Sequence, residues 1–181
     1  MDNNKSHKTP IRKSHGSGMF ERSQFHRIGK NVIIEDGVLV FHPENIEIGD
    51  DVYVGHHTIL KGYYRGRMLI GDGTWIGQQC FFHSAGDIFI GKNVGIGPAV
   101  KIITSFHAEE GLLKPILYSE IECAPVVIED DADIGTGAIV LPGVTILKGT
   151  QVGAGAVVTK NYPEYAVIAG VPARLLRIRG A

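Results

Sequence analysis

Apolar residues recur at every sixth position along most of the chain. One run is Ile48, Val54 and Leu60, and the longest continues from Ile128 to Val158. A helix gives a period near 3.6 residues and a strand a period of 2, so neither explains a period of six. A short strand, a tight turn and another short strand do explain it. We therefore expect an all-β fold, a parallel β-helix whose strands stack coil on coil around the repeated Ile and Val column.

A second column supports this interpretation. A small or β-branched residue usually stands four positions after the apolar residue, and Gly, Asp or Asn often lies between them. These turn residues tolerate the positive φ angles that tight turns require. The second column consists of Val52, Thr58, Val94, Val100, Ala132, Ala138, Val144 and Ala156.

Similar octets mark the starts of successive coils, at Ile28, Ile48, Ile70, Ile90, Ile128 and Ile146. Their spacings of 20, 22, 20, 38 and 18 residues exceed three hexapeptides in every interval but the last. The extra residues fall in the third hexapeptide of each coil, near 42–45, 63–67, 83–87 and 104–125. Insertions in one segment of a repeat emerge on one face of a solenoid, which is often the binding face. We expect about six coils over residues 28–158, with a protruding loop at 104–125.

Both ends of the chain depart from the period. Residues 1–27 are polar and are predicted to form a mobile arm or a strip along a neighbouring subunit. Residues 159–181 are predicted to form a short C-terminal cap, because an open β-helix end exposes unpaired strand edges. A strand followed by a short helix from Pro172 would serve as this cap.

Composition narrows the function classes. The chain has 181 residues, a net charge of −1 and two cysteines, Cys80 and Cys123. We expect no nucleic-acid partner, because no basic field is present, and no membrane span, because no apolar run reaches about 20 residues. Two cysteines make neither a disulfide framework nor a zinc pattern, and we expect a cytoplasmic protein.

Two of the eight histidines, His83 and His107, lie on the segment that carries the insertions, in successive coils. Stacking can bring loops that bear them close together, so they are the candidates for chemistry. The other histidines are expected to be incidental residues of turns or of the N-terminal arm. They are His7, His15, His26, His42, His56 and His57.

The runs LPGVTI, GAGAVVTK and AGVPAR, with ITSFH upstream, together resemble hexapeptide-repeat acyltransferases. The resemblance is to bacterial sugar O-acetyltransferases of the galactoside and maltose acetyltransferase type and to surface-polysaccharide acetyltransferases, and it covers about Ile28 to Arg177. It implies a left-handed parallel β-helix in a homotrimer, with acetyl-CoA bound in clefts between subunits. The left hand comes from the resemblance, because periodicity alone cannot give it.

The resemblance also implies roles for individual residues. His107 matches the general base, and Thr136 matches the position whose backbone N–H faces the thioester carbonyl. Lys160 and Arg174 would supply positive charge for phosphates. The implied coenzyme-binding residues are Gly135, Thr136, Ala154, Thr159, Lys160, Pro172 and Arg174. No metal is expected.

The chain departs from this family on the acceptor side. Asp133 stands where members often carry Trp, and Gly77 and Ala85 stand where an Asn and an Asp hold the sugar in galactoside enzymes. The acceptor is therefore expected to be neither a simple galactoside nor maltose. A nucleotide-linked or lipid-linked sugar of a surface-polysaccharide pathway is the favoured class. The residues predicted to line the altered acceptor pocket are His83, Trp75, Tyr64 and Arg65.

The predicted reaction is direct transfer of an acetyl group to a sugar hydroxyl or amine. Neutral His107 would take the proton of the attacking atom, and Glu109 or Glu110 is a candidate to orient the imidazole. Cys80 is expected in the core and Cys123 lacks an evident base, so no acyl-enzyme is predicted.

Two alternatives remain open. A β-helical, γ-type zinc carbonic anhydrase would bind metal through three histidines, but no histidine follows His107 to complete its ligand pattern. A non-catalytic scaffold has no evident need for the coenzyme-side residues Thr136, Thr159 and Lys160.

Overall fold

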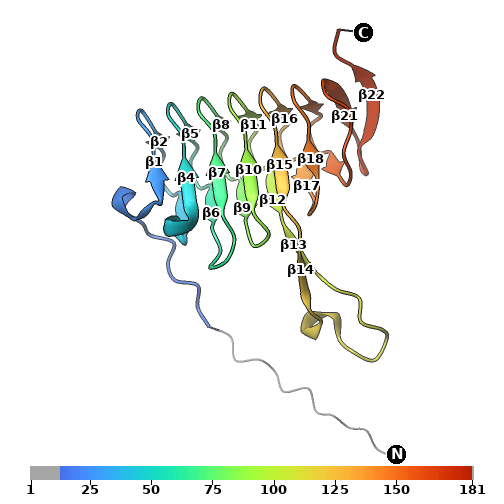
Figure 1. Ribbon diagram of the computed structural model, residues 1–181, viewed down its shortest axis with the longest axis horizontal. Helices are drawn as coiled ribbons and strands as arrows, with labels where there is room; N and C mark the ends of the chain where they lie inside the picture. Colours follow the sequence, from blue (N-terminus) through green and yellow to red (C-terminus); the bar gives the residue numbers. More distant parts are fainter. Residues whose placement is uncertain (1–12, 181) are drawn as a thin grey trace, which may run out of the picture.

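Short parallel strands wind into a three-sided prism, with the first coil at one end of its long axis and the C-terminal strands at the other (Figure 1). The structure is a computed structural model that describes residues 13–180, so His7 lies outside the described residues. The fold is a left-handed parallel β-helix with six complete coils and one further strand. This confirms the fold class expected from the period of six.

Three sheets form the sides of the prism. Sheet A contains β1 (Arg27–Ile28), β4 (Ile46–Ile48), β7 (Met68–Ile70), β10 (Ile88–Ile90), β15 (Val126–Ile128) and β18 (Thr145–Ile146). Sheet B contains β2 (Ile33–Ile34), β5 (Tyr53–Val54), β8 (Trp75–Ile76), β11 (Gly95–Ile96), β16 (Asp133–Ile134), β19 (Gln151–Val152), β21 (Ala166–Ala169) and β22 (Arg174–Ile178). Sheet C contains β3 (Leu39–Phe41), β6 (Ile59–Lys61), β9 (Phe81–His83), β12 (Lys101–Ile103), β17 (Ile139–Val140) and β20 (Val157–Val158). The turns between sheets form the A–B, B–C and C–A edges of the prism.

The interior holds both repeated columns. Ile76, Ile96 and Ile134, stacked in sheet B, are fully buried, and their partners in sheets A and C are buried in the same way. Every residue of the second column is also buried. Each coil therefore contributes the same few apolar side chains to one continuous core, as expected of a solenoid.

Residues in the left-handed region make the tight turns. At the A–B edge they are Asn31, Asp51, Gly73, Asn93, Asp131 and Gly149, with φ between +54° and +69°. The B–C edge places His57, Gln79 and Ala99 in the same conformation, with φ of +58° or +59°. Such angles are uncommon outside Gly, Asn and Asp, so these B–C turns were not recognisable from composition.

The C–A edge carries all of the insertions. The largest projects from the prism as an antiparallel hairpin (Figure 1), in which β13 (Ser105–His107) pairs with β14 (Ile121–Cys123). A 3₁₀ turn, η3 (Ile116–Tyr118), lies near its tip, and another, η2 (Pro43–Asn45), fills the first short insertion. Placing every insertion on one edge leaves the other two edges regular.

The end of the predicted arm packs against the first coil. Phe25 is buried, and its ring meets that of Phe20 edge to face, with centroids 5.6 Å apart. The N–H of Val40 donates to the carbonyl of Gly18 at 2.8 Å. η1 (Arg22–Gln24) lies between the two phenylalanines. Residues 18–27 are therefore an N-terminal cap, which corrects the expectation of a mobile arm for this part of the chain.

The C-terminal cap consists of two strands. β21 continues sheet B in parallel with β19, and β22 then reverses direction and pairs antiparallel with β21. The short helix expected from Pro172 was wrong, since Pro172 lies in the turn before β22 and residues 159–180 contain no helix. An extended β22 occupies the edge of β21 that would otherwise be unpaired, which a helix could not do.

Within residues 13–180, no helix has the length and apolar character needed to cross a bilayer.

Candidate functional site

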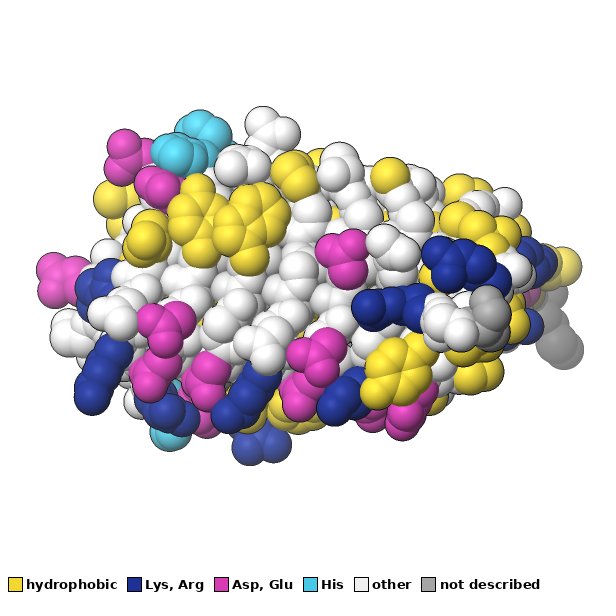
Figure 2. Space-filling view, turned by 90° about the horizontal axis from the view of Figure 1, so that it is seen from above, with side chains coloured by type: hydrophobic (Ala, Val, Ile, Leu, Met, Phe, Trp, Pro, Cys, Tyr) yellow, Lys and Arg dark blue, Asp and Glu magenta, His cyan; other side chains and the backbone are white. Residues whose placement is uncertain are grey.

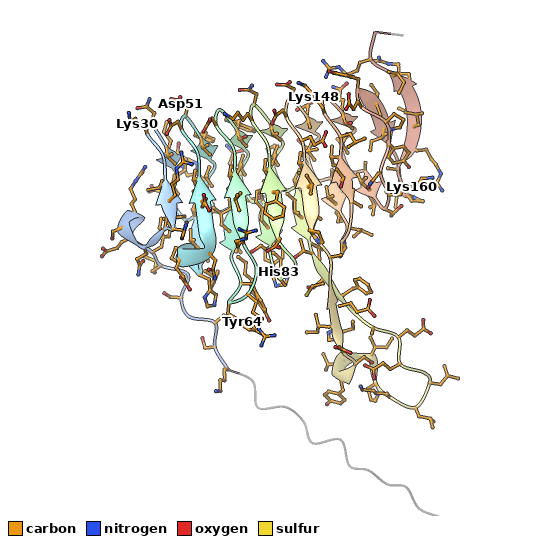
Figure 3. All side chains as sticks on the ribbon, in the orientation of Figure 1. Lys30, Asp51, Tyr64, His83, Lys148 and Lys160 are labelled. Carbon is orange, nitrogen blue, oxygen red and sulfur yellow. The ribbon has the colours of Figure 1, made fainter. Side chains whose placement is uncertain are left out.

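A hollow of about 200 Å³ lies on the C–A edge, where the insertions gather. His83 at the end of β9, Tyr64 and Arg65 in the loop between β6 and β7, and Ser105 on β13 line it. Figure 3 shows Tyr64 and His83 side by side on this edge. Three of the four predicted acceptor residues are thus brought together. The fourth, Trp75, lies on β8 in sheet B and does not line this hollow.

Aromatic contacts fix the imidazole of His83. Its ring stacks parallel to Phe81, with centroids 6.2 Å apart, and meets the Tyr63 ring edge to face at 5.5 Å. The Nδ1 atom of His83 lies 3.4 Å from Oγ of Ser105. Across the hollow, the Arg65 guanidinium lies 5.3 Å from the centre of the Tyr64 ring. The hollow therefore combines flat aromatic walls with one cation and two polar side chains.

Burial lowers the pKa of His83 below its ordinary value, and the positive charges of Lys61 and His15 lower it further. A neutral imidazole is thereby favoured at the floor of the hollow. Neutral imidazole can donate one hydrogen bond and accept another, which suits contact with a hydroxyl-bearing ligand.

His107 lies on the same side of the hairpin as Ser105, because alternate residues of a strand point the same way. Its Nδ1 atom is 3.3 Å from the carbonyl oxygen of Ser119. When Nδ1 carries the proton, it donates to this carbonyl and leaves Nε2 as an acceptor. The exposed His107 side chain then presents the nitrogen that a general base uses.

A backbone carbonyl, rather than a carboxylate, orients this imidazole. Glu110, one of the two predicted orienting residues, instead pairs with Lys114 and accepts a hydrogen bond from the N–H of Glu120 at 2.6 Å. These contacts tie the two arms of the loop together. Glu109 is exposed and, among residues 13–180, forms no hydrogen bond or ion pair with His107.

A row of small residues follows the B–C edge through consecutive coils. Thr136 lies in the turn between β16 and β17, and its carbonyl accepts from the N–H of Gly155, beside Ala154 in the next coil, at 2.8 Å. One coil further, the N–H of Val157 donates to Gly170, close to Pro172. Thr136, Ala154 and Pro172, which are expected to bind coenzyme, thus lie along one exposed strip. We call it the coenzyme strip.

Two backbone N–H groups of this strip are unpaired among the described residues. The N–H groups of Thr136 and Ala154 donate to no acceptor within residues 13–180. A Cβ atom on Gly97 would lie 2.6 Å from the Thr136 nitrogen, and one on Gly135 would lie 2.6 Å from the Ala154 nitrogen. The two glycines therefore let adjacent coils approach closely at this edge, where a side chain would collide with the backbone of the next coil.

The remaining predicted coenzyme residues are exposed near the C-terminal end. Lys160 places its Nζ atom 5.6 Å from the centre of the Tyr162 ring, and Thr159 precedes it. Arg174 donates through Nη1 to the carbonyl of Ala173 at 2.9 Å. Both cations keep free N–H groups, which fits the binding of phosphate.

One chain does not gather all of the predicted site. His107 and the hollow lie on the C–A edge, whereas Thr136 and Ala154 lie on the B–C edge, so sheet C separates them. Sequence reasoning missed Tyr63, Ser105 and Cys123 in the hollow. Ser105 could have been found from its position two residues before His107, and Tyr63 from its place in the same insertion as Tyr64.

Cys80 is buried, as its place in the period predicted, and burial raises the pKa of its thiol to about 11. Cys123 is exposed on β14 and lines the hollow. Among residues 13–180, no group of three or more His, Cys, Asp or Glu side chains is arranged to hold a metal ion.

Known proteins resemble this chain in sequence and in fold. The galactoside O-acetyltransferase of Lactococcus lactis is 31% identical over 159 residues, which are 86% of this chain and 64% of that protein. A maltose O-acetyltransferase from Clostridium difficile superposes with a TM-score of 0.63 at 29% identity, covering 87% of this chain and 71% of the other. AntD, an N-acyltransferase from Bacillus cereus, gives a TM-score of 0.78 at 24% identity, covering 87% and 85%.

These relatives are longer than the match. The chain spans between 47% and 65% of the length of the first curated relatives that it matches. No model of a known protein family matches the chain. The resemblance to hexapeptide-repeat acetyltransferases therefore rests on individual relatives and on the fold.

Proposed function

We propose that this chain, which resembles hexapeptide-repeat acyltransferases in sequence and fold, transfers an acetyl group from acetyl-CoA to a hydroxyl or amine of a sugar. One observation carries the proposal: the Nδ1 atom of His107 faces the Ser119 carbonyl, which leaves Nε2 exposed on the insertion-bearing edge. A neutral imidazole held in this tautomer can accept a proton at Nε2 and so act as a general base.

The coenzyme strip on the B–C edge fits the acyl donor. A pantetheine arm carries amide and carbonyl groups that hydrogen-bond to backbone N–H donors, and Thr136 and Ala154 offer such donors beside small side chains. Lys160 and Arg174, further along, would meet the phosphates. AntD, which has the same fold, has been solved in complex with dTDP and 3-hydroxybutyryl-CoA. Acetyl-CoA would supply an activated acyl group at the thioester carbon.

The hollow fits a polar acceptor that carries an anionic group. Arg65 stacked on Tyr64 offers a guanidinium for a phosphate, and His83 offers hydrogen bonds for a hydroxyl. A nucleotide-linked or lipid-linked sugar has both features. The galactoside and maltose enzymes among the relatives act on sugars, which supports this acceptor class.

In the proposed mechanism, Nε2 of His107 accepts the proton of the acceptor hydroxyl or amine as that atom attacks the thioester carbon. The N–H of Thr136 donates to the carbonyl oxygen, on which negative charge develops. The tetrahedral intermediate collapses, the C–S bond breaks, and the thiolate of coenzyme A takes up the proton from His107. No acyl-enzyme is needed: Cys80 is buried and its high pKa disfavours the thiolate, and the exposed Cys123 thiol has no hydrogen-bonded base among residues 13–180.

The mechanism needs residues from both edges of the prism, which one chain keeps apart. A homotrimer would close the gap, because three prisms around one axis can place the C–A edge of one subunit against the B–C edge of the next. Mass photometry at nanomolar concentration should give a trimer mass. A monomer that still turns over acetyl-CoA would contradict this arrangement.

The proposed function is tested by acetyl-CoA turnover. Release of free coenzyme A is followed with a thiol reagent while free sugars, nucleotide sugars and glycolipids are offered in turn. We expect acceptor-dependent release with at least one class and none with the His107→Gln protein. Failure of calorimetry to detect acetyl-CoA binding would overturn the proposal.

A further inference from the structure

An aromatic pair and a gap lie side by side on the outer face of sheet B. The outward residues of consecutive coils follow the strand register: Ile33, Tyr53, Trp75, Gly95, Asp133 and Gln151. Figure 2, viewed from above, shows hydrophobic side chains near both ends of the prism and mainly backbone and other uncharged atoms between them. The feature lies outside the hollow and the coenzyme strip.

Tyr53 holds Trp75 on one side only. The two rings are parallel within 5°, with centroids 5.6 Å apart, so one face of the indole is covered. Glu35 interacts with the Tyr53 hydroxyl and also lies 3.6 Å from Nε2 of His56. The Trp75 side chain nevertheless remains 43% exposed. Its second face points along the column toward the next coil.

That next position is a glycine. A Cβ atom built on Gly95 would meet only Oδ1 and Cγ of Asp133 within 4 Å, at 2.8 and 3.8 Å, and no atom of Trp75. Adjacent coils are about 4.8 Å apart, so the backbones of Trp75 and Asp133 stand roughly 9–10 Å apart along the axis, and the Asp133 carboxylate reaches back over Gly95. The result is a slot with an indole face at one end, a carboxylate at the other, and a backbone floor.

We infer that this slot binds one pyranose ring of the acceptor saccharide. A pyranose has an apolar face of C–H groups and a rim of hydroxyls. Its C–H face would pack on the indole at about 3.5–4 Å, the ordinary contact distance of carbon atoms. The remaining depth accommodates a hydroxyl, which would donate to the Asp133 carboxylate.

The carboxylate favours a sugar over an apolar protein partner. Asp133 is exposed, and its side chain has no hydrogen-bond or ion-pair partner within residues 13–180. Covering the slot with an apolar surface would bury this charge unpaired, which is strongly unfavourable. A hydroxyl-bearing ring satisfies the carboxylate and covers the indole at once.

The slot is also continuous with the coenzyme strip. Asp133 stands three residues before Thr136, so the ring would lie on the sheet that borders the B–C edge. The identification of the ring as part of the acceptor rests on the proposed function. Binding of a saccharide in the slot does not require acetyl transfer.

Trp75 is the only tryptophan of the chain, so its fluorescence reports on the slot directly. We would titrate the protein without coenzyme using methyl glucoside, methyl galactoside, N-acetylglucosamine and short oligosaccharides, with mannitol as an acyclic polyol control. The expected result is a saturable change in Trp75 emission with at least one cyclic saccharide and none with mannitol. No change with any cyclic saccharide would overturn the inference.

Two variants keep Trp75 as the reporter. Gly95→Val fills the slot, and Asp133→Asn keeps the shape but removes the charge. Each should weaken saccharide affinity by roughly 10-fold or more, because a charge-assisted hydrogen bond or the packing space is lost. Ile33→Ala, on the far side of Tyr53, is the matched control and should leave affinity unchanged. Equal affinity in both test variants would overturn the assignment of the site even if saccharide binds.

A titration with coenzyme A separates the two proposals. If coenzyme A alone changes Trp75 emission and saccharides do not, the slot belongs to the donor and the inference is wrong, while the proposed acetyl transfer stands. If saccharide binds in the slot but acetyl-CoA does not bind at all, the inference stands and the proposed function fails.

Discussion

The Nδ1 atom of His107 lies 3.3 Å from the carbonyl oxygen of Ser119, across the hairpin that projects from the C–A edge. Ser119 is buried, although its own hydroxyl has no hydrogen-bond partner among the described residues. The loop therefore presents a fixed backbone acceptor to the imidazole. This contact sets the tautomer on which the proposed mechanism depends.

Replacing His107 should remove most of the turnover while sparing donor binding. We expect His107→Gln to lower kcat by roughly 100- to 10,000-fold, the usual contribution of a general base. Affinity for coenzyme A, measured by calorimetry, should change little, because the proposed coenzyme contacts come from the B–C edge and the C-terminal end and none comes from His107. Ser119→Ala is the matched control, since it removes only the unpartnered hydroxyl and keeps the carbonyl. A kcat near the wild-type value in His107→Gln would place the base elsewhere.

Lys160 should contribute to donor affinity through charge. Lys160→Ala is expected to weaken coenzyme A binding by about 1.5–3 kcal/mol, as for a lost hydrogen bond to a charged group. Lys148→Ala is the control, because Lys148 lies on the A–B edge beside Asp131 (Figure 3). Isothermal calorimetry should show weaker binding in the first variant only. Equal affinities would make Lys160 a solvated residue held by Tyr162.

His83 should make stability depend on pH. Burial, with Lys61 and His15, lowers the pKa of His83 in the folded protein, so the unfolded chain binds the proton more readily. The associated stability is complete above the ordinary histidine pKa of about 6.5 and is lost as pH falls through and below that value. The free energy of unfolding from urea titrations should therefore drop more between about pH 8 and about pH 5.5 in the wild type than in His83→Gln. Identical pH dependence in both proteins would show that this imidazole is not desolvated.

The two cysteines should react at very different rates. Iodoacetamide at about pH 8 should label exposed Cys123 quickly and leave Cys80 unmodified in the native protein, since the thiolate is the reactive form and burial raises the pKa of Cys80 to about 11. Mass spectrometry of tryptic peptides would distinguish the two sites. A true acceptor should slow the labelling of Cys123, because that residue lines the hollow with His83. Rapid labelling of Cys80 would mean that the core opens under native conditions.

The repeated part of the fold could be predicted from the sequence because each coil repeats the same pattern of buried apolar positions. Ile76, Ile96 and Ile134 occupy equivalent positions, so an error in one copy is corrected by the others. The single-copy ends offer no such redundancy. The burial of Phe25 and the reversal of β22 depend on tertiary contacts, which the six-residue period does not predict.

The candidate site was predictable to a similar extent. The insertions predicted a binding face on the C–A edge, and the resemblance implied roles for His107 and Thr136, which stay predictions. The pairing of His107 with Ser119 was not predictable, because it depends on how the two arms of a non-repeating loop meet. Trp75 and His83, both predicted to line the acceptor pocket, belong to the same coil but to different sheets. Their separation follows from the prism, in which one coil passes through all three sheets.

The reversal of direction at β22 affects end-to-end association, a risk for every solenoid protein. A parallel coil ends in strands whose free edges match the edges at the opposite end of an identical molecule, so uncapped prisms would add end to end and grow into filaments. β22 presents an antiparallel edge in sheet B, which has no counterpart of the same polarity at the N-terminal end, where Phe20 and Phe25 lie over the first coil. The length of the rod is thus limited by two short end segments, and one of them, β22, also carries Arg174, a proposed phosphate-binding residue.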